Sequence, residues 1–249
     1  MAAYEAFADV YDALMDDVDY DAWAEYYLAL IGRQGVAAPK TLCDCACGTG
    51  SLSVRFAERG IRVTGVDLSG EMLSRAQQKA RRHGVMAMFV EQDMRNLALP
   101  RPVDALVCGC DGVNYLLSDD QVREFLQCAH RALRPGGALA FDVSSPHKLE
   151  HVIGNGFFGE ERDDVAYLWS NRFDAASRTV TMDLTFFARE SGELYRRFAE
   201  IHTQRAHEPE RLRQLLAKSG FIDIHVFGDR TFEPPSADAL RVHIAATRE

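Results

Sequence analysis

Apolar positions along the chain follow two alternating spacings between residues 41 and 145. Short runs of β-forming residues predict five buried strands, at 41–46, 61–66, 85–90, 103–110 and 138–143. Stripes at helical spacing lie between these runs, and three of the predicted helices begin at a serine that is placed to cap them: Ser51, Ser69 and Ser118. Strands separated by helices indicate an α/β fold with a parallel sheet wound on both faces.

Two further stripes at helical spacing precede this region and predict a helical cap over residues 1–35. They consist of Phe7, Val10, Tyr11 and Leu14, and of Trp23, Tyr26, Tyr27 and Leu30. Periodicity alone favours simple packing of these aromatic residues on the main domain. In the alternative interpretation, Phe7 or Tyr11 closes over a cofactor pocket.

The spacing changes after Pro146. Three runs in which polar and apolar residues alternate predict antiparallel strands, at 165–173, 178–187 and 193–203. We therefore expect residues 147–205 to form an inserted antiparallel β-subdomain. This small sheet is expected to lie over the carboxyl edge of the main sheet, where the active site would be.

The α/β spacing resumes after the insertion. Pro209 stands at the first position of a predicted helix, and two strands follow at 221–227 and 241–247. The loop between these strands is too short for a crossover helix, so they should pair antiparallel. The main domain then comprises residues 36–146 and 206–249.

Composition narrows the range of partners. With 249 residues, 47% hydrophobic and 26% charged, the chain is typical of a globular protein, and its formal charge of −9 argues against a nucleic-acid partner. No secretory leader is visible, and no apolar run approaches the roughly 20 residues of a membrane span. We expect a cytoplasmic protein without a membrane partner. Exposed strand edges in the insertion would allow a homodimer.

The six cysteines permit two interpretations. Cys43, Cys45 and Cys47 alternate along one predicted strand, and Cys108 and Cys110 along another, so thiolates of neighbouring strands would cluster as metal ligands. Zinc sites, however, space their cysteines by two to four residues on a turn. We favour buried, free thiols in a reducing compartment and expect no metal site.

A glycine-rich turn follows the first strand, and an acidic residue ends the second. Gly48 and Gly50 allow a ligand to approach the backbone closely, and Asp67 is placed to accept hydrogen bonds from both hydroxyls of a ribose. A dinucleotide fingerprint would have a third glycine where this chain has Ser53. The pattern predicts a cofactor that carries a nucleoside.

Five segments in order closely resemble the class I S-adenosylmethionine-dependent methyltransferases: 42–50, 65–72, 92–95, 104–115 and 133–137. The resemblance covers roughly residues 38–145 and resumes at 208–249. It implies a Rossmann-like seven-stranded sheet whose last hairpin makes one strand antiparallel. It also implies S-adenosylmethionine as cofactor and S-adenosylhomocysteine as product, and leaves an NAD dehydrogenase as a distant alternative.

The same resemblance implies roles for particular residues. The turn after the first strand would hold the methionine part of the cofactor, with Asp44 bracing the turn and Ala46, Cys47, Gly48 and Gly50 forming it. The usual first glycine of that turn is Ala46 here.

The adenosine part would be held by two further loops. Asp67 would take the ribose hydroxyls, and Leu68 and Met72 would flank the adenine. Asp93 would reach the adenine amino group, with the Met94 backbone beside it. Cys110 and Asp111 would lie by the methionine amine and the methyl group.

A narrower resemblance rests on residues 7–12 and on the insertion. Both look like the small-molecule N-methyltransferases of the glycine/sarcosine and amino-sugar N-dimethyl types, in which an N-terminal tyrosine approaches the cofactor. This resemblance makes Tyr11 a cofactor contact. The expected position of the methyl group gives four candidate catalytic residues, namely Tyr11, Asp111, Tyr115 and His147, with Asn114, Tyr195 and His202 as further candidates. The amino-sugar enzymes tend to carry Gly-His where this chain has Asn114-Tyr115.

These features predict methyl transfer to a small-molecule acceptor, at a nitrogen. Two alternatives remain open: a methyltransferase that acts on RNA or protein, and an inactive regulatory protein that binds the cofactor. The sequence identifies neither the acceptor nor the methylated atom.

Overall fold

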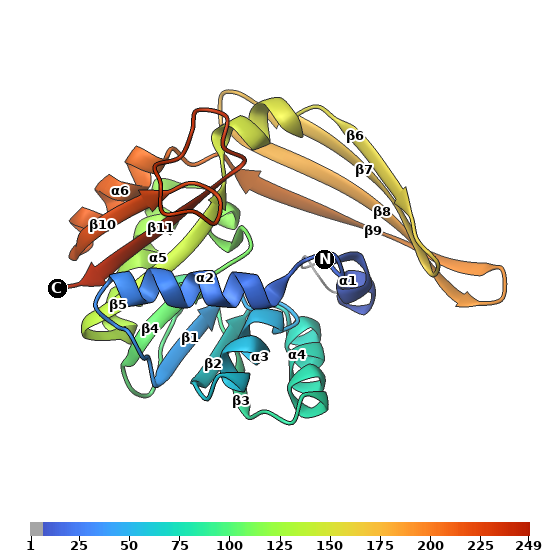
Figure 1. Ribbon diagram of the computed structural model, residues 1–249. Coiled ribbons are helices and arrows are strands. Elements are labelled where there is room, and N and C mark those ends of the chain that lie inside the picture. The colour runs from blue at the N-terminus through green and yellow to red at the C-terminus, as the bar shows by residue number, and fades with distance from the viewer. Residues whose placement is uncertain (1–6) are drawn as a thin grey trace.

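The main sheet of the protein has seven strands, in the order β10-β11-β5-β4-β1-β2-β3 (Figure 1). The structure is a computed structural model that describes residues 7–249. The strands are β1 (Thr41–Cys45), β2 (Arg62–Asp67), β3 (Ala87–Glu91), β4 (Val103–Cys108), β5 (Leu133–Ser144), β10 (Phe221–Phe227) and β11 (Arg241–Arg248). Only β11 runs against its neighbours β5 and β10. The predicted α/β fold with an antiparallel last hairpin is therefore confirmed.

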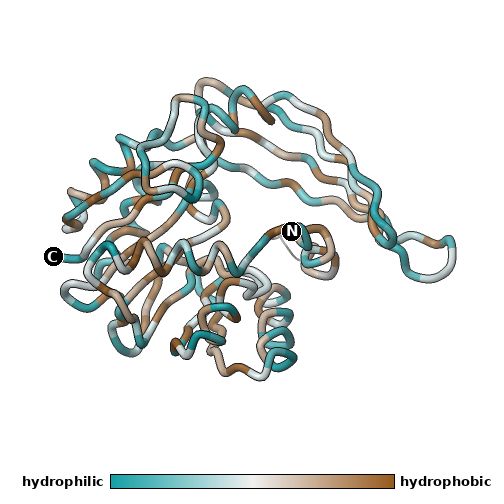
Figure 2. Tube along the Cα trace, viewed as in Figure 1, coloured by the Kyte–Doolittle hydropathy of each residue, from teal (hydrophilic) through white to brown (hydrophobic). Residues whose placement is uncertain are grey.

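Helices cover both faces of this sheet. Residues of α2 (Tyr20–Arg33) and α3 (Ser51–Glu58) share one apolar core with the sheet, and residues of α5 (Asp119–Ala132) and α6 (Pro209–Lys218) share the other. The remaining long helix, α4 (Gly70–Arg82), packs beside β3. Figure 2 shows apolar residues concentrated in the strands between these layers.

Two of the three predicted serine caps are present. Ser69 Oγ accepts a hydrogen bond from the Met72 amide, and Ser118 Oγ accepts one from the Gln121 amide, both at 3.2 Å. The prediction for Ser51 was wrong because Gly50 is the N-cap residue of α3, in the left-handed region at φ 73°. This shift frees the Ser51 hydroxyl for a different contact, described below.

A second, four-stranded sheet is formed by β6 (Phe157–Glu161), β7 (Val165–Asp174), β8 (Thr179–Ser191) and β9 (Leu194–Arg205), each antiparallel to the next. The three predicted strands are present. The sequence did not indicate β6, because this short edge strand is largely exposed and lacks an alternating pattern. Three short helical turns complete the fold: η1 (Met94–Asn96), η2 (Gly112–Tyr115) and η3 (Lys148–Val152).

The inserted sheet extends from the end of β5 to the N-terminal helix α1 (Ala8–Leu14) (Figure 1). Val10 of α1 packs in one cluster with Val165 and Phe186 of the insertion, and the Phe7 ring stacks on Phe186 at 4.6 Å. The first six residues of the predicted helical cap lie outside the described residues. Within residues 7–249, every helix is too short or too polar to span a lipid bilayer.

Candidate active site

A cavity of about 390 Å³ lies at the carboxyl ends of β1, β2 and β4, beneath α1. Its size and its concave, largely apolar lining are typical of a small-molecule site. Eleven of the residues predicted for the site line it: Tyr11, Asp44, Ala46, Cys47, Gly48, Asp67, Leu68, Met72, Met94, Cys110 and Tyr115. Four predicted residues do not, namely Gly50, Asp93, Asp111 and His147, and neither do the further candidates Asn114, Tyr195 and His202.

The turn after β1 opens the cavity to the backbone. Ala46 and Gly48 have φ angles of 53° and 54°, in the left-handed region. A Cβ at Gly48 would meet nothing within 4 Å, so a ligand has room against this peptide. At Gly50 a Cβ would lie 2.8 Å from Ala76 Cβ, so this glycine is needed for the packing of α4. Gly50 thus supports the turn without facing the cavity.

Asp67 ends β2 and ties two segments of the cavity wall together. One carboxylate oxygen accepts a hydrogen bond from the Gly48 amide at 2.8 Å, and the other accepts one from the Ser69 amide at 2.9 Å. Burial raises the pKa of Asp67, while these amide hydrogen bonds act in the opposite direction. The carboxylate is therefore held at a fixed place in the cavity wall.

Asp44 supports the turn from below. Its side chain is almost fully buried and accepts a hydrogen bond from Ser53 Oγ at 2.6 Å. Burial acts to raise the pKa of Asp44 and the Ser53 hydrogen bond acts to lower it. Burial prevails, and the pKa is raised to about 7. Ser53 occupies the position at which a dinucleotide motif has its third glycine. Its hydroxyl explains why a serine suits this turn.

The loop after β4 is held by a buried network behind the cavity. Cys110 and Asp111 both have positive φ angles, and their amides donate to the Asp142 carboxylate at 2.7 and 3.2 Å. Tyr27 Oη also donates to Asp142, at 2.5 Å. Arg241 pairs with Asp111 and with Asp142. The loop therefore offers Cys110 to the cavity, whereas Arg241 holds the Asp111 carboxylate outside its lining.

Burial raises the pKa of the Asp111 carboxyl, but the charges of Arg241 and Lys148 and the hydrogen bonds from Arg241 and Ser144 together outweigh it, so the pKa lies below its usual value. The Asp111 carboxylate is thus a partner of a buried cation. This arrangement does not suit the catalytic role predicted for it.

Asp93 and His147 have other partners as well. Arg95 binds the Asp93 carboxylate through its guanidinium and its amide, and Gln92 lines the cavity instead. The ring of His147 lies 5.5 Å from that of His151, at the start of η3.

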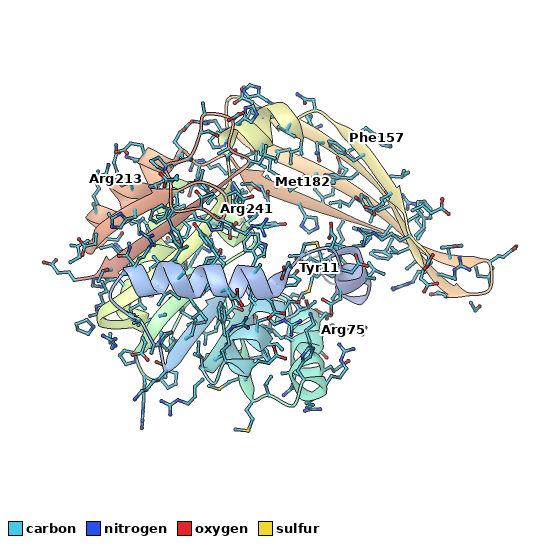
Figure 3. The ribbon with its side chains drawn as sticks, viewed as in Figure 1. Tyr11, Arg75, Phe157, Met182, Arg213 and Arg241 are labelled. Carbon is cyan, nitrogen blue, oxygen red and sulfur yellow. The ribbon has the colours of Figure 1, made fainter. Side chains whose placement is uncertain are left out.

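Several cavity residues escaped the sequence analysis, among them Tyr20, Thr49, Ser51 and Gln92. The roof over the cavity comprises Tyr11 and Tyr20, and burial raises the pKa of both phenols, so both keep their protons. Figure 3 shows Tyr11 at α1 and Arg241 at β11, on different sides of the space between the two sheets.

Lys79 of α4 connects α1, which carries Tyr11, to the turn after β1 and the start of α3. Its ammonium donates to Asp12 of α1 at 2.8 Å, to Thr49 Oγ1 at 2.9 Å and to Ser51 Oγ at 2.6 Å. The side chain is largely buried, and this burial lowers its pKa, which Asp12 acts to raise. Its position in the apolar stripe of α4, between Ala76 and Ala80, is the sequence signal that could have revealed it.

All six cysteines are free. Cys43 and Cys45 lie with their sulfurs 3.7 Å apart, and burial raises the pKa of the Cys47 and Cys110 thiols that line the cavity. Across residues 7–249, no three or more His, Cys, Asp or Glu side chains are grouped so that they would hold a metal ion.

The cavity fits an adenosyl cofactor. Asp67 lines it with a carboxylate, a group that can accept hydrogen bonds from ribose hydroxyls, and Gly48 leaves open space against the backbone. Leu68 lines the cavity with 64% of its surface exposed, so a flat apolar ring has a surface to cover there.

Comparison with known proteins assigns the family. A family model described as a methyltransferase domain matches residues 42–137. The chain is 38% identical over 246 residues to the Bacillus subtilis (strain 168) protein named "Putative methyltransferase YqeM". The aligned region covers 98% of this chain and 97% of that protein. It is also 30% identical over 141 residues to a glycine/sarcosine N-methyltransferase of Halorhodospira halochloris. That aligned region covers 55% of this chain and 52% of that protein.

A solved structure agrees over the whole chain. The S-adenosylmethionine-dependent methyltransferase from Clostridium acetobutylicum ATCC 824 has a TM-score of 0.88, is 31% identical, and covers 99% of both chains. These similarities remove the NAD dehydrogenase alternative. The chain therefore belongs to the class I S-adenosylmethionine-dependent methyltransferases, and S-adenosylmethionine is its cofactor.

Proposed function

We propose that the protein transfers the methyl group of S-adenosylmethionine to a nitrogen atom of a small-molecule acceptor. The observation that carries this proposal is the cover over the cavity. The roof residue Tyr11 comes from α1, and Tyr115 of the cavity wall contacts His202 of the inserted sheet at 3.2 Å. A folded macromolecule would have to displace this cover, whereas a small molecule fits beneath it. The similarity to a glycine/sarcosine N-methyltransferase supports the choice of nitrogen.

In this proposal the cofactor lies along the carboxyl ends of β1, β2 and β4. The backbone at Ala46, Cys47 and Gly48 meets its methionine part, and Asp67 binds the ribose hydroxyls. The side chains of Leu68 and Met72, with Met94 beside them, flank the adenine. Cys110 lies at the end of the cavity where the methyl group is transferred.

The protein's contribution to such a reaction is alignment and exclusion of water. Methyl transfer from a sulfonium is an in-line displacement, so the rate depends on holding the acceptor nitrogen on the axis of the breaking bond. The nitrogen must also present a lone pair and, after transfer, lose a proton. Tyr11 and Tyr115 are the tyrosines from the predicted catalytic set that line the cavity.

A cell extract separated by ultrafiltration into small molecules and macromolecules tests the proposal. Each fraction is incubated with the protein and S-adenosylmethionine, and S-adenosylhomocysteine is measured by mass spectrometry. We expect product with the small-molecule fraction, and with at least one of glycine, sarcosine and glucosamine added alone. Product with only the macromolecular fraction would show an RNA or protein acceptor. No product with any fraction would favour an inactive cofactor-binding protein.

A further inference from the structure

A second cavity, of about 820 Å³, lies at the edge of the main sheet opposite the cofactor cavity. It is lined by the residues that begin β1, β2, β3 and β4, namely Thr41, Arg62, Ala87 and Val103. These strand ends point away from the inserted sheet (Figure 1). We propose that this cavity, called the basal groove below, binds an extended segment of another protein that carries both acidic and apolar side chains. The proposal is independent of the methyl acceptor.

On one face, the helices leave this corner of the main sheet uncovered. The core that α5 and α6 share with the sheet includes Val66 of β2 and none of the described residues of β3. Arg62 and Thr64 precede Val66 at intervals of two residues, so they lie on the same side of the strand. Met88 lies directly across from Thr64 on β3. The amino ends of these two strands therefore present an open surface.

Exposed methionines give the basal groove its apolar character. Met86 and Met88 are 92% and 52% exposed, and both line the groove together with Leu99. A single exposed apolar residue is ordinary, but here two flank one hollow. Methionine side chains are unbranched and flexible, so they can adapt to the apolar side chains of a partner.

Three arginines give the groove its charge. Among its described lining residues the charged ones are Arg62, Arg81 and Arg101, and all three are exposed. Within residues 7–249 none of these guanidinium groups pairs with a carboxylate. The carboxylate of Asp104, just inside β4, is bound by Arg134 instead. In a chain whose formal charge is −9, the groove is thus a locally positive surface that is complementary to carboxylates.

The composition favours a protein segment over a nucleic acid. The centres of protein interfaces are enriched in methionine and arginine and depleted in lysine, aspartate and glutamate, and the described lining of the groove follows this pattern. That lining contains no aromatic ring on which a base could stack.

The length of the groove suits an extended chain. It spans the amino ends of β4, β1, β2 and β3, which are neighbours in that order. At about 4.8 Å between neighbouring strands this distance is roughly 14 Å, the length of about four residues of extended chain.

NMR of methionine methyl groups tests the proposal on the whole protein. Met86→Leu and Met88→Leu assign the two signals, and the probe is a synthetic peptide of repeated Glu-Glu-Leu-Gly units, added to millimolar concentration at low salt. We expect saturable shifts of Met86 and Met88, while Met72 and Met94 of the cofactor cavity stay unchanged. S-adenosylhomocysteine should have the reverse effect, because it binds at the other edge of the sheet.

Variants and altered peptides test the chemistry of recognition. The double variant Arg62→Gln/Arg101→Gln should raise the Kd for the peptide by about tenfold or more, because charged hydrogen-bond donors are lost. Arg213→Gln is the control, since it removes the same charge from α6 on a different side of the molecule (Figure 3), and it should match the wild type. Peptides of Lys-Lys-Leu-Gly or Glu-Glu-Ser-Gly units should bind more weakly, because each lacks one of the two complementary features.

Four results would overturn the proposal. The acidic peptide might shift neither Met86 nor Met88, or the lysine peptide might shift them as strongly. The double variant and Arg213→Gln might bind the acidic peptide equally well. Shifts of Met86 and Met88 on raising the protein concentration alone would assign the groove to a second copy of the chain. A tighter response to a single-stranded oligonucleotide than to the peptide would assign it to a nucleic acid.

Discussion

Asp67 and Asp111 were both predicted to contact the cofactor, yet only Asp67 lines the cavity. Asp67 accepts hydrogen bonds from two backbone amides at the end of β2, the strand end at which the motif Gly-Val-Asp placed it. Asp111 was placed at the cavity by the family resemblance, but its partner Arg241 lies 130 residues away. A local pattern contains no signal for such a contact. The position of Asp67 at the cavity was thus predictable from its place at a strand end, whereas the distant partner of Asp111 was not.

The raised pKa of Asp44 makes the stability of the protein depend on pH. The unfolded chain loses this proton near 3.8 and the folded protein near 7, so raising the pH through that interval favours the unfolded state. His207, whose pKa burial lowers to about 4, contributes the opposite slope. The two contributions must therefore be separated by a variant.

Asp44→Asn isolates the Asp44 contribution. The amide still accepts the Ser53 hydrogen bond but does not titrate, so the wild type should lose free energy of unfolding relative to the variant as the pH rises from about 4 to 7. Urea unfolding of both proteins across this range measures the difference. A constant difference would show that Asp44 titrates at its ordinary pKa.

Replacing Asp67 should weaken cofactor binding directly. Asp67→Asn keeps one acceptor for the backbone amides but loses an acceptor for the ribose. The free energy of S-adenosylhomocysteine binding should therefore become less favourable by about 1–3 kcal/mol. Isothermal titration calorimetry measures it. Asp93→Asn is the matched control, since Asp93 binds Arg95 outside the cavity lining, and it should have a smaller effect. Equal losses in both variants would count against the ribose contact.

At the scale of elements, α1 is held from two sides. Lys79 connects it to α4 and to the turn after β1, while Phe7 and Val10 pack on the inserted sheet. Helical spacing predicted that α1 exists, and periodicity alone favoured packing over a role at the pocket. The structure shows both, because one face of this short helix meets Phe186 and Tyr11 lines the cavity.

Lys79→Met should loosen α1. The variant keeps the apolar stem of the side chain but removes three hydrogen bonds, so the Kd for S-adenosylhomocysteine should rise and amide hydrogen exchange in residues 8–14 should accelerate. Arg82→Met removes a cation from an exposed position of the same helix and should change neither. Unaltered exchange in α1 of Lys79→Met would mean that the apolar contacts suffice to hold it.

At the scale of the whole molecule, the two sheets differ in how far the sequence determined them. Each strand–helix unit of the main sheet repeats a local signal, so the parallel sheet could be predicted, and the short last loop predicted the antiparallel pairing of β10 and β11. The inserted sheet showed its strands through alternation, but its edge strand β6 carried no such pattern. The contacts that attach the insertion to the cavity, such as His202 with Tyr115, join segments 87 residues apart and left no periodic signature.

Phe186→Ala tests the attachment of the insertion to α1. The ring is buried between Phe7 and Phe198, and its loss should cost about 3–5 kcal/mol of local stability. Hydrogen–deuterium exchange should accelerate in β7, β8, β9 and α1 and stay unchanged in β1 and β4. Phe187→Ala, on the opposite face of β8, is the control and should have a smaller effect. Faster exchange throughout the main sheet would show that the two sheets unfold as one unit.

Because α1 is clamped between the cofactor cavity and the insertion, the departure of one ligand is tied to that of the other. We expect a spent cofactor to leave past this short helix, and the same movement would open the side of the cavity that Tyr11 lines. We therefore predict an ordered cycle in which the cofactor enters first and exits last. Steady-state kinetics of such an enzyme would be sequential and ordered, with S-adenosylhomocysteine competing against S-adenosylmethionine alone.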